Sequence, residues 1–255
     1  MKVQLIRNAT IVVEYAGKKM LVDPMFAKKG ALARGPMPAK DWNWKRNPNN
    51  ELPLPVEEII KDIDFMVLTH LHFDHWDKAA ADALPKNLKI FVQDENDQKS
   101  IKKSGFTDVE ILTENSAFGD IQLSRTRAQH GKGFILKLAG QVAGIVLRHP
   151  SEKTLYIAAD TVWYEEVEKT IVKFKPEVIV VNGGDNRFII GDQLVMSKED
   201  IYKTHLAAPK ADIIVVHMEG VYHNTLSRKE LRHFVDQKSI GKNIIIPEDG
   251  ETVRL

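Results

Sequence analysis

Four side chains that can bind a metal ion lie within six residues of one another: His70, His72, Asp74 and His75. They follow an apolar segment, residues 65–69, which is predicted to be a buried strand. The end of such a strand is a rigid place from which catalytic groups can be presented. Imidazole nitrogens suit zinc, iron and manganese, and a carboxylate adds negative charge and a harder ligand. We therefore interpret this segment as part of a metal site rather than as a solvated histidine-rich loop.

Three further candidates, His130, Asp160 and His217, each follow a predicted strand later in the chain. They stand 55, 85 and 142 residues after His75. Taken alone, His130 and His217 are more typical of structural histidines inside a core. From the residues by themselves, both interpretations of these two histidines stay open.

The composition limits the kind of protein and the kind of metal site. Hydrophobic residues make up 43% of the 255 residues, which is enough for a core and excludes a disordered chain. The absence of cysteine excludes disulfide scaffolds, cysteine zinc sites, iron–sulfur clusters and thiol nucleophiles. Any metal must therefore be held by histidine, aspartate or glutamate. The formal net charge of +1 argues against a protein that coats nucleic acid or adheres to a membrane.

The hydrophobic pattern indicates neither a signal peptide nor a membrane span. Residues 1–5 contain no uninterrupted apolar run and no small-residue cleavage site. The longest hydrophobic stretch, residues 134–147, is interrupted by Lys137 and Gln141 and falls short of the ~18 apolar residues that span a bilayer. We therefore expect a cytoplasmic protein.

The predicted elements repeat one order twice along the chain. Strands are predicted at 3–6, 11–15, 20–22, 65–69, 89–92, 121–127, 134–138, 143–147, 154–158, 178–181, 213–216 and 244–246. Helices are predicted at 56–62, 78–84, 94–103 and 164–174, and two more begin at Ser197 and Ser227. Strands followed by alternating strands and helices, twice over, favour an α/β fold of two sheets packed face to face with helices outside each.

The length allows one large domain or two small ones, and we expect a single domain over residues 1–255 because both halves supply candidate ligands. A long segment, about residues 25–55, contains five prolines together with Trp42 and Trp44. Loops of more than ~15 residues are unusual in compact domains and are typical of a functional lid or a flexible insert. The two tryptophans favour the lid.

The motif H-x-H-x-D-H after a buried strand resembles the hallmark of the metallo-β-lactamase superfamily, and the resemblance extends over nearly the whole chain. It implies an αββα four-layer sandwich of two mixed sheets with helices outside. It also implies two sets of metal ligands, with Asp160 as a carboxylate that bridges both metals. The first set is His70, His72 and His130, and the second is Asp74, His75 and His217. Ala159 stands where many relatives carry a glycine before the bridging aspartate.

The same resemblance implies a metal-dependent hydrolase. Two divalent ions, zinc by preference and manganese or iron as alternatives, would lie ~3.5–4 Å apart and lower the pKa of a shared water toward ~7. The resulting hydroxide attacks the substrate, while Asp74 orients it and carries its proton to the leaving group. A mononuclear hydrolase is the alternative form. Within the superfamily, the chain resembles the group that includes L-ascorbate-6-phosphate lactonase, through residues 21–24 (LVDP), 181–184 (VNGG), 217–219 (HME) and 222–224 (YHN).

Candidate contacts with the substrate lie on loops after predicted strands. Asn182 and Arg187 lie in a Gly/Asn-rich loop, residues 182–191, and both are candidate substrate contacts. Arg187 could clamp an anionic group, and a solvated arginine is the alternative. His223 could polarise the substrate and assist proton transfer, or it packs a turn. Trp163 is a packing residue first and a pocket wall second. Asp23 could support a metal-binding histidine, or it merely ends a strand.

These observations predict cleavage of a small lactone, ester or amide, including anionic or phosphorylated substrates. The alternative is a metal-dependent phosphodiesterase or nuclease of the same superfamily, against which the balanced charge argues. A diiron oxidoreductase would carry glutamate in place of His72 and a flavin domain, and a glyoxalase-II-like thioesterase would need a longer helical segment after His217. A non-catalytic metal-binding protein is the remaining alternative. We expect a small-molecule substrate and no nucleic acid or membrane as partner, and the resemblance suggests a homo-oligomer.

Overall fold

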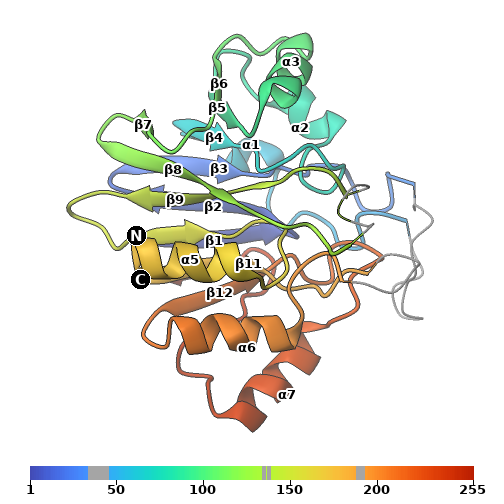
Figure 1. Ribbon diagram of the computed structural model, residues 1–255. Helices are drawn as coiled ribbons and strands as arrows, with labels where there is room; N and C mark the ends of the chain where they lie inside the picture. Colours follow the sequence, from blue (N-terminus) through green and yellow to red (C-terminus); the bar gives the residue numbers. More distant parts are fainter. Residues whose placement is uncertain (34–45, 134–135, 137–138, 188–192) are drawn as a thin grey trace.

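Two seven-stranded sheets lie face to face, and helices cover the outer face of each (Figure 1). The computed structural model describes residues 1–33, 46–133, 136, 139–187 and 193–255, and the structural statements below concern these residues. Both sheets mix parallel and antiparallel strands. The predicted α/β sandwich of two mixed sheets with helices outside is thereby confirmed.

The first sheet has the strand order β14-β1-β2-β3-β4-β5-β6. Its strands are β1 (Lys2–Arg7), β2 (Thr10–Tyr15), β3 (Lys18–Val22), β4 (Phe65–Val67), β5 (Lys89–Val92), β6 (Val109–Ile111) and β14 (Thr252–Arg254). The strands from β14 to β3 pair antiparallel, and those from β3 to β6 pair parallel. The outer face is covered by α1 (Val56–Ile59), α2 (Lys78–Ala83) and α3 (Glu95–Lys103).

The second sheet has the strand order β13-β12-β11-β10-β9-β8-β7. Its strands are β7 (Ser116–Phe118), β8 (Ile121–Arg127), β9 (Ala143–Arg148), β10 (Leu155–Ile157), β11 (Val178–Asn182), β12 (Asp212–Val216) and β13 (Ile244–Ile245). The strands from β10 to β13 pair parallel. The outer face is covered by α5 (Glu165–Phe174), α6 (Lys198–Ala207) and α7 (Arg228–Lys238).

The parallel strands bury apolar side chains on both of their faces. In β4, Phe65 and Val67 join the core between the sheets, whereas Met66 faces the helices of the first sheet. In β12, Ile214 joins the core between the sheets, and Ile213 faces the helices of the second sheet. Strands buried on both faces have continuous apolar sequences, which is why these two could be found from the sequence. The polar residues that follow them are held at the rim of a rigid layer.

Side-chain caps fix where the helices begin. Ser227 caps α7 in a capping box with Glu230, and Ser197 caps α6, as predicted. Asp77 caps α2 by accepting a hydrogen bond from the backbone N–H of Ala80 at 2.8 Å. The metal-binding motif therefore leads directly into a helix, which holds the end of the motif in place.

The ends of the predicted long loop are anchored to other elements. Arg7, fully buried, donates hydrogen bonds to the carbonyl oxygens of Met25 and Ala27 at 2.8 and 2.9 Å. At the other end, the backbone N–H of Asn49 donates to the carbonyl oxygen of Gly220 at 2.8 Å. Residues 34–45, whose tryptophans favoured a lid, lie outside the described residues.

The structure adds three short strands that the sequence analysis did not predict, namely β6, β7 and β14, each of three residues. The strand predicted at 134–138 falls mainly on residues outside the described part, and Leu136 within it is helical rather than extended. No helix in the described part of the chain is long and apolar enough to cross a membrane.

The core between the sheets predicts that truncation of a buried leucine and of an exposed leucine changes the free energy of unfolding by very different amounts. Leu147 is fully buried between the sheets, whereas Leu206 on α6 is 59% exposed. We expect Leu147→Ala to lower the free energy of unfolding by about 2–5 kcal/mol, because it removes apolar contacts and leaves a cavity. Leu206→Ala, the same chemical change, should alter it by less than about 0.5 kcal/mol. Urea unfolding of both variants measures this, and equal losses would contradict a core shared by the two sheets.

Candidate metal centre

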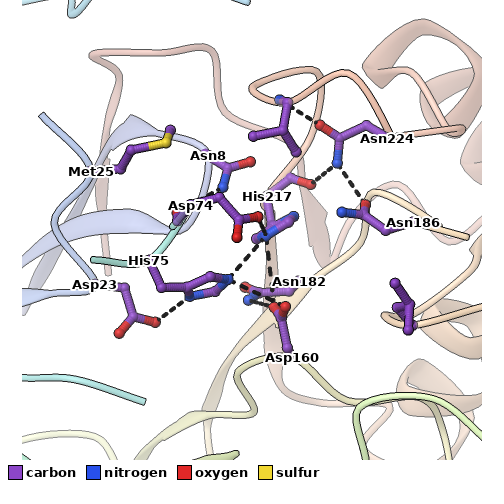
Figure 2. Close-up of polar contacts among 12 residues, drawn as sticks. Asn8, Asp23, Met25, Asp74, His75, Asp160, Asn182, Asn186, His217 and Asn224 are labelled. Atoms are coloured by element: carbon purple, nitrogen blue, oxygen red, sulfur yellow. Dashed lines mark hydrogen bonds and ion pairs between the residues drawn. The ribbon is translucent and has the colours of Figure 1, made fainter. Parts of the chain in front are cut away.

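The seven predicted ligand residues converge after strands of both sheets. Figure 2 shows Asp74, His75, Asp160 and His217 close to one another. The seven residues follow four different strands: β4 (His70, His72, Asp74 and His75), β8 (His130), β10 (Asp160) and β12 (His217). Six of the seven are no more than 4% exposed, and His72 is partly exposed. Residues that are far apart in sequence thus form one buried cluster with a single more open member.

The ligand atoms form three groups, and within each group they all lie within 4.8 Å of one another. The groups are His70–His72–His130, His70–His75–Asp160 and Asp74–His75–His217. His70 and His75 each belong to two groups and therefore connect them. This arrangement resembles two neighbouring metal positions, although the assignment of each residue to a metal ion stays a prediction.

The carboxylate of Asp160 lies beside His75, Asn182 and His217 (Figure 2). Its Oδ2 is 3.2 Å from Nε2 of His75 and 3.6 Å from Nε2 of His130, and its Oδ1 is 3.8 Å from Nε2 of His217. The amide of Asn182 donates a hydrogen bond to Oδ1 at 2.6 Å. One carboxylate therefore reaches histidines of both predicted ligand sets, as a bridging ligand must.

The imidazole of His217 lies beside Asp74, His75 and Asp160 (Figure 2). Its Nε2 is 3.2 Å from Oδ2 of Asp74 and 3.2 Å from Nε2 of His75. Its backbone has a φ of +62°, in the left-handed region, and is held from both sides. The N–H of His217 donates to the carbonyl oxygen of Asn8 at 2.8 Å, and its own carbonyl accepts from the amide of Asn224 at 3.0 Å. The cluster is thus positioned by backbone contacts as well as by side chains.

Asn8 and Ala159 show how the chain turns at the site. Asn8 also donates from its side-chain amide to the carbonyl oxygen of Asp74 at 3.1 Å, so one residue holds two candidate ligands. Ala159 has a φ of +60°, a conformation that glycine adopts without strain and alanine does not. The glycine of many relatives suits this backbone, and the alanine here retains the same turn.

Three of the histidines are held from behind by the ring nitrogen that faces away from the cluster. Nδ1 of His130 contacts the carbonyl oxygen of Leu194 at 2.9 Å, and Nδ1 of His75 contacts Oδ2 of Asp23 at 2.8 Å. Nδ1 of His70 contacts the hydroxyl of Thr69 at 3.1 Å. Partners of this kind fix the orientation of metal-binding histidines and leave Nε2 for the metal.

The residues present fit a metal ion. Nε2 of His70 is buried and has no hydrogen-bond partner among the described residues. An unpaired buried nitrogen costs free energy, whereas a cation in the cluster would use its lone pair. Two carboxylates and several imidazole nitrogens within coordination reach form a donor set that suits zinc, manganese or iron.

The surroundings favour the unprotonated form of several candidate ligands, which leaves their lone pairs available to a metal ion. Burial, together with the neighbouring imidazoles, lowers the pKa of His70 well below its ordinary value. Burial alone would raise the pKa of Asp160 and of Asp74, but nearby imidazoles outweigh it and hold both pKa values well below the usual range. At His75, burial lowers the pKa, but Asp160 and Asp23 outweigh it and raise the pKa well above its ordinary value. A cation would therefore compete with a proton chiefly at His75.

The residues predicted to contact substrate lie in different surroundings. His223 is 5% exposed, and its ring centroid is 6.4 Å from that of Phe73, inside the metal-binding motif. Asn182 is bonded to Asp160, as described above, and Trp163 packs against the apolar cluster beneath α5 and α6. Arg187 contacts Asp185 at 3.0 Å. Their roles toward a substrate stay predictions.

Several residues that build the site were missed by the sequence analysis. Asn8 lies between the predicted strands at 3–6 and 11–15, and Thr69 is the last residue of the strand predicted at 65–69. Asn224 bonds both the carbonyl of His217 and the side chain of Asn186, the latter at 2.6 Å. A buried asparagine that donates to the backbone of a distant residue leaves no local pattern in the sequence. Only Thr69 directly follows an apolar run, residues 65–68.

Comparisons with known proteins place the chain among its relatives. Residues 18–218 match the model of the beta-lactamase superfamily domain. The chain is 51% identical over 253 residues to the UPF0173 protein YddR of Bacillus subtilis, covering 99% of both chains. It is 40% identical to a solved isothiocyanate hydrolase from Delia radicum gut bacteria, covering 100% of this chain and 99% of that one, with a TM-score of 0.94.

A second solved structure, a possible metal-dependent hydrolase from Veillonella parvula, is 35% identical with a TM-score of 0.96, and covers 100% of this chain and 99% of its own. The resemblance to the metallo-β-lactamase superfamily is thereby confirmed, and the nearer likeness to the lactonase group is not established by these matches. The chain belongs to the beta-lactamase superfamily and, within it, to the UPF0173 family.

Proposed function

We propose that the chain is a metal-dependent hydrolase of small molecules, with the histidine–aspartate cluster as its active site. The observation that carries this proposal is the convergence of seven ligand residues whose free ring nitrogens and carboxylate oxygens face one another. The similarity to an isothiocyanate hydrolase and to a possible metal-dependent hydrolase supports it. Because both halves of the chain supply these residues, we propose that residues 1–255 act as one unit.

Two divalent ions are proposed, because Asp160 reaches histidines of both sets. The first set is His70, His72 and His130, and the second is Asp74, His75 and His217. Bound ions would polarise the atom under attack and lower the pKa of water beside it. Zinc is the first metal to test because the donors are mainly imidazole nitrogens, and manganese and iron are the alternatives.

For the substrate, we propose isothiocyanates as the first class. This rests on the 40% identity to the isothiocyanate hydrolase over the whole chain. Water adds to the central carbon of R–N=C=S to give R–NH–C(=O)–SH, which loses carbonyl sulfide and releases the amine R–NH2. Lactones, esters and amides also present an electrophilic carbon and belong to the same chemistry. A small neutral substrate also agrees with the net charge of +1, which offers no general attraction for nucleic acid.

Two residues are proposed to handle protons. Asp74, whose carboxylate points at His217 (Figure 2), would accept the proton of the attacking water. Burial lowers the pKa of His223 to about 4, so its imidazole is neutral near pH 7. Its Nδ1 has no hydrogen-bond partner in the described part of the chain. A neutral imidazole can donate an N–H to the substrate nitrogen as the amine leaves.

A substrate panel on the purified protein tests the proposal. Allyl and benzyl isothiocyanate should be turned over with release of the amine, measured by mass spectrometry, and with kcat/KM at least about tenfold above a γ-lactone, an aryl ester and an anilide. Dialysis against a chelator should abolish turnover and zinc should restore it, because the cluster holds the ions. Elemental analysis of the active protein gives the identity and number of the ions.

The other substrates decide between the alternatives. Cleavage of a phosphodiester alone would support the phosphodiesterase interpretation, and cleavage of the lactone alone would support the lactonase-like one. Full activity after complete metal removal would contradict a metal-dependent hydrolase.

His72→Ala should reduce kcat/KM by more than about 100-fold without unfolding the protein. The reason is that His72 contributes a ligand nitrogen but is the one partly exposed member of the cluster, so its loss leaves the core intact. Circular dichroism and thermal unfolding check the fold. His233→Ala, which removes an exposed histidine of α7, is the matched control and should keep full activity.

His223 should also make stability depend on pH. Its pKa is about 4 when folded and ~6.5 when unfolded, so the unfolded state binds more protons between these values and stability falls as the pH falls through this window. In metal-free protein, the free energy of unfolding of the wild type should fall by up to about 3 kcal/mol more than that of His223→Gln as the pH is lowered through this window. His233→Gln should leave the pH profile unchanged, and an unchanged profile for His223→Gln would contradict a buried neutral imidazole.

A further inference from the structure

We propose that Asp23 is a positioning residue that sets where two histidines of the cluster carry their protons, His75 directly and His70 through Thr69. This inference rests on the proposed function, because it concerns how the cluster is prepared for cations. It assigns a role to a residue that, from the sequence, equally well only ended a strand. Figure 2 shows Asp23 behind His75, on the side away from Asp160.

Asp23 is held rigidly before it contacts any histidine. It follows β3, is 2% exposed and has a φ of +47°, which places its side chain beside β4 rather than along β3. Its N–H donates to the carbonyl oxygen of Val67 at 3.2 Å, and its carbonyl accepts from the hydroxyl of Thr10 at 2.7 Å. Contacts with the neighbouring strands β2 and β4 therefore fix the backbone from which the carboxylate of Asp23 extends.

The carboxylate of Asp23 makes three hydrogen bonds, and all three partners are at the site. Oδ1 accepts from the backbone N–H of Thr69 at 2.8 Å. Oδ2 accepts from the hydroxyl of Thr69 at 2.6 Å and contacts Nδ1 of His75 at 2.8 Å. A carboxylate can only accept, so Nδ1 of His75 must carry a proton. Nε2 of His75 is therefore the nitrogen that would give its lone pair to a cation, in exchange for the proton that Asp160 otherwise favours there.

Thr69 passes the same constraint to His70. A threonine hydroxyl has one proton, and here the proton is donated to Asp23. The hydroxyl oxygen can therefore only accept from Nδ1 of His70, which lies 3.1 Å away. Nδ1 of His70 carries the proton, and Nε2, the buried nitrogen without a partner among the described residues, carries the lone pair.

His70 and His75 are the two histidines for which this matters most, because each belongs to two of the three ligand groups. His217 provides the contrast. Its Nδ1 has no hydrogen-bond partner in the described ranges, and its position is set through the backbone instead. One carboxylate outside the cluster thus prepares both histidines that join the two predicted metal positions.

Asp23→Asn tests the inference with almost no change of shape. The N–H of Thr69 requires an acceptor, so the amide oxygen takes the place of Oδ1 and the NH2 group faces His75 and the Thr69 hydroxyl. His75 would then have to carry its proton on Nε2, and the hydroxyl of Thr69, which no longer donates to residue 23, would be free to donate to Nδ1 of His70. We expect zinc affinity, measured by competition with a chelator, to fall about 10–100-fold. Asp64→Asn is the control, because Asp64 precedes β4 at its opposite end and accepts from the N–H of Lys19 at 2.8 Å.

Substitutions of Thr69 separate the direct effect of Asp23 on His75 from its indirect effect on His70. Thr69→Val removes the hydroxyl and should weaken zinc binding through His70 alone, while His75 keeps its proton on Nδ1. Thr69→Ser restores the hydroxyl and should recover wild-type affinity. Nitrogen-15 spectra of histidine-labelled, zinc-loaded protein report which ring nitrogen is protonated. In the wild type, both His70 and His75 should show a protonated Nδ1 and a zinc-bound Nε2.

The outcomes are distinguishable. If the wild-type protein fails to bind zinc, manganese or iron, the proposed function is wrong and this inference falls with it. If the wild type binds zinc and Asp23→Asn binds it equally well, the inference alone is overturned. A purely structural Asp23 would lower the free energy of unfolding and leave the zinc affinity of the folded variant unchanged, which also overturns it. Should Asp23→Asn fail to fold, the difference between Thr69→Val and Thr69→Ser still decides.

Discussion

The contact between the carboxylate of Asp160 and the surrounding imidazoles is the interaction on which the rest of the site depends. A buried carboxylate is costly unless opposite charge or donors surround it. Here Asn182 donates to one oxygen, and four histidines from both sheets lie within 4 Å of the two oxygens. Because those histidines follow different strands, the carboxylate is satisfied only when the two sheets are packed in the observed register.

Sharp turns after the strands bring the functional side chains inward. Asp23, Ala159 and His217 all have φ values between +47° and +62°, a region that L-residues seldom adopt. Strained backbone of this kind is typical of functional sites, where surrounding contacts compensate for it. The compensation is visible at His217, whose N–H and carbonyl oxygen are both hydrogen-bonded to asparagines. The sheets hold the ends of the strands rigidly, and these turns orient the side chains of the site.

Much of the fold and of the candidate cluster could be predicted from the sequence, for identifiable physical reasons. β4 and β12 are buried on both faces, so they have unbroken apolar sequences, which located the histidines after them at the ends of strands. The cluster after β4 indicated a metal site by itself, whereas His217 became a candidate ligand through the family resemblance. The capping residues Ser197 and Ser227 marked helices correctly because capping is local.

What could not be predicted depends on distant partners or on short elements. β14 has three residues, and its pairing with β1 joins positions about 250 residues apart, such as Lys2 and Arg254. The support that Asn8 gives to His217 likewise crosses the whole chain. The role of Asp23 became clear only from its three contacts, because an Asp-Pro pair after a strand has the same sequence in either role.

The attachment of Asn8 to His217 has a consequence for the order of events during synthesis. Asn8 is among the first residues to be synthesised, but the N–H of His217, to which its carbonyl oxygen is hydrogen-bonded, is made more than 200 residues later. Until then, His70, His72 and His75 belong to a half-built cluster that lacks the carboxylate of Asp160 and the imidazole of His217. A growing chain therefore offers only part of the predicted ligand set, and the set is complete only once Asp160 and His217 have also been made.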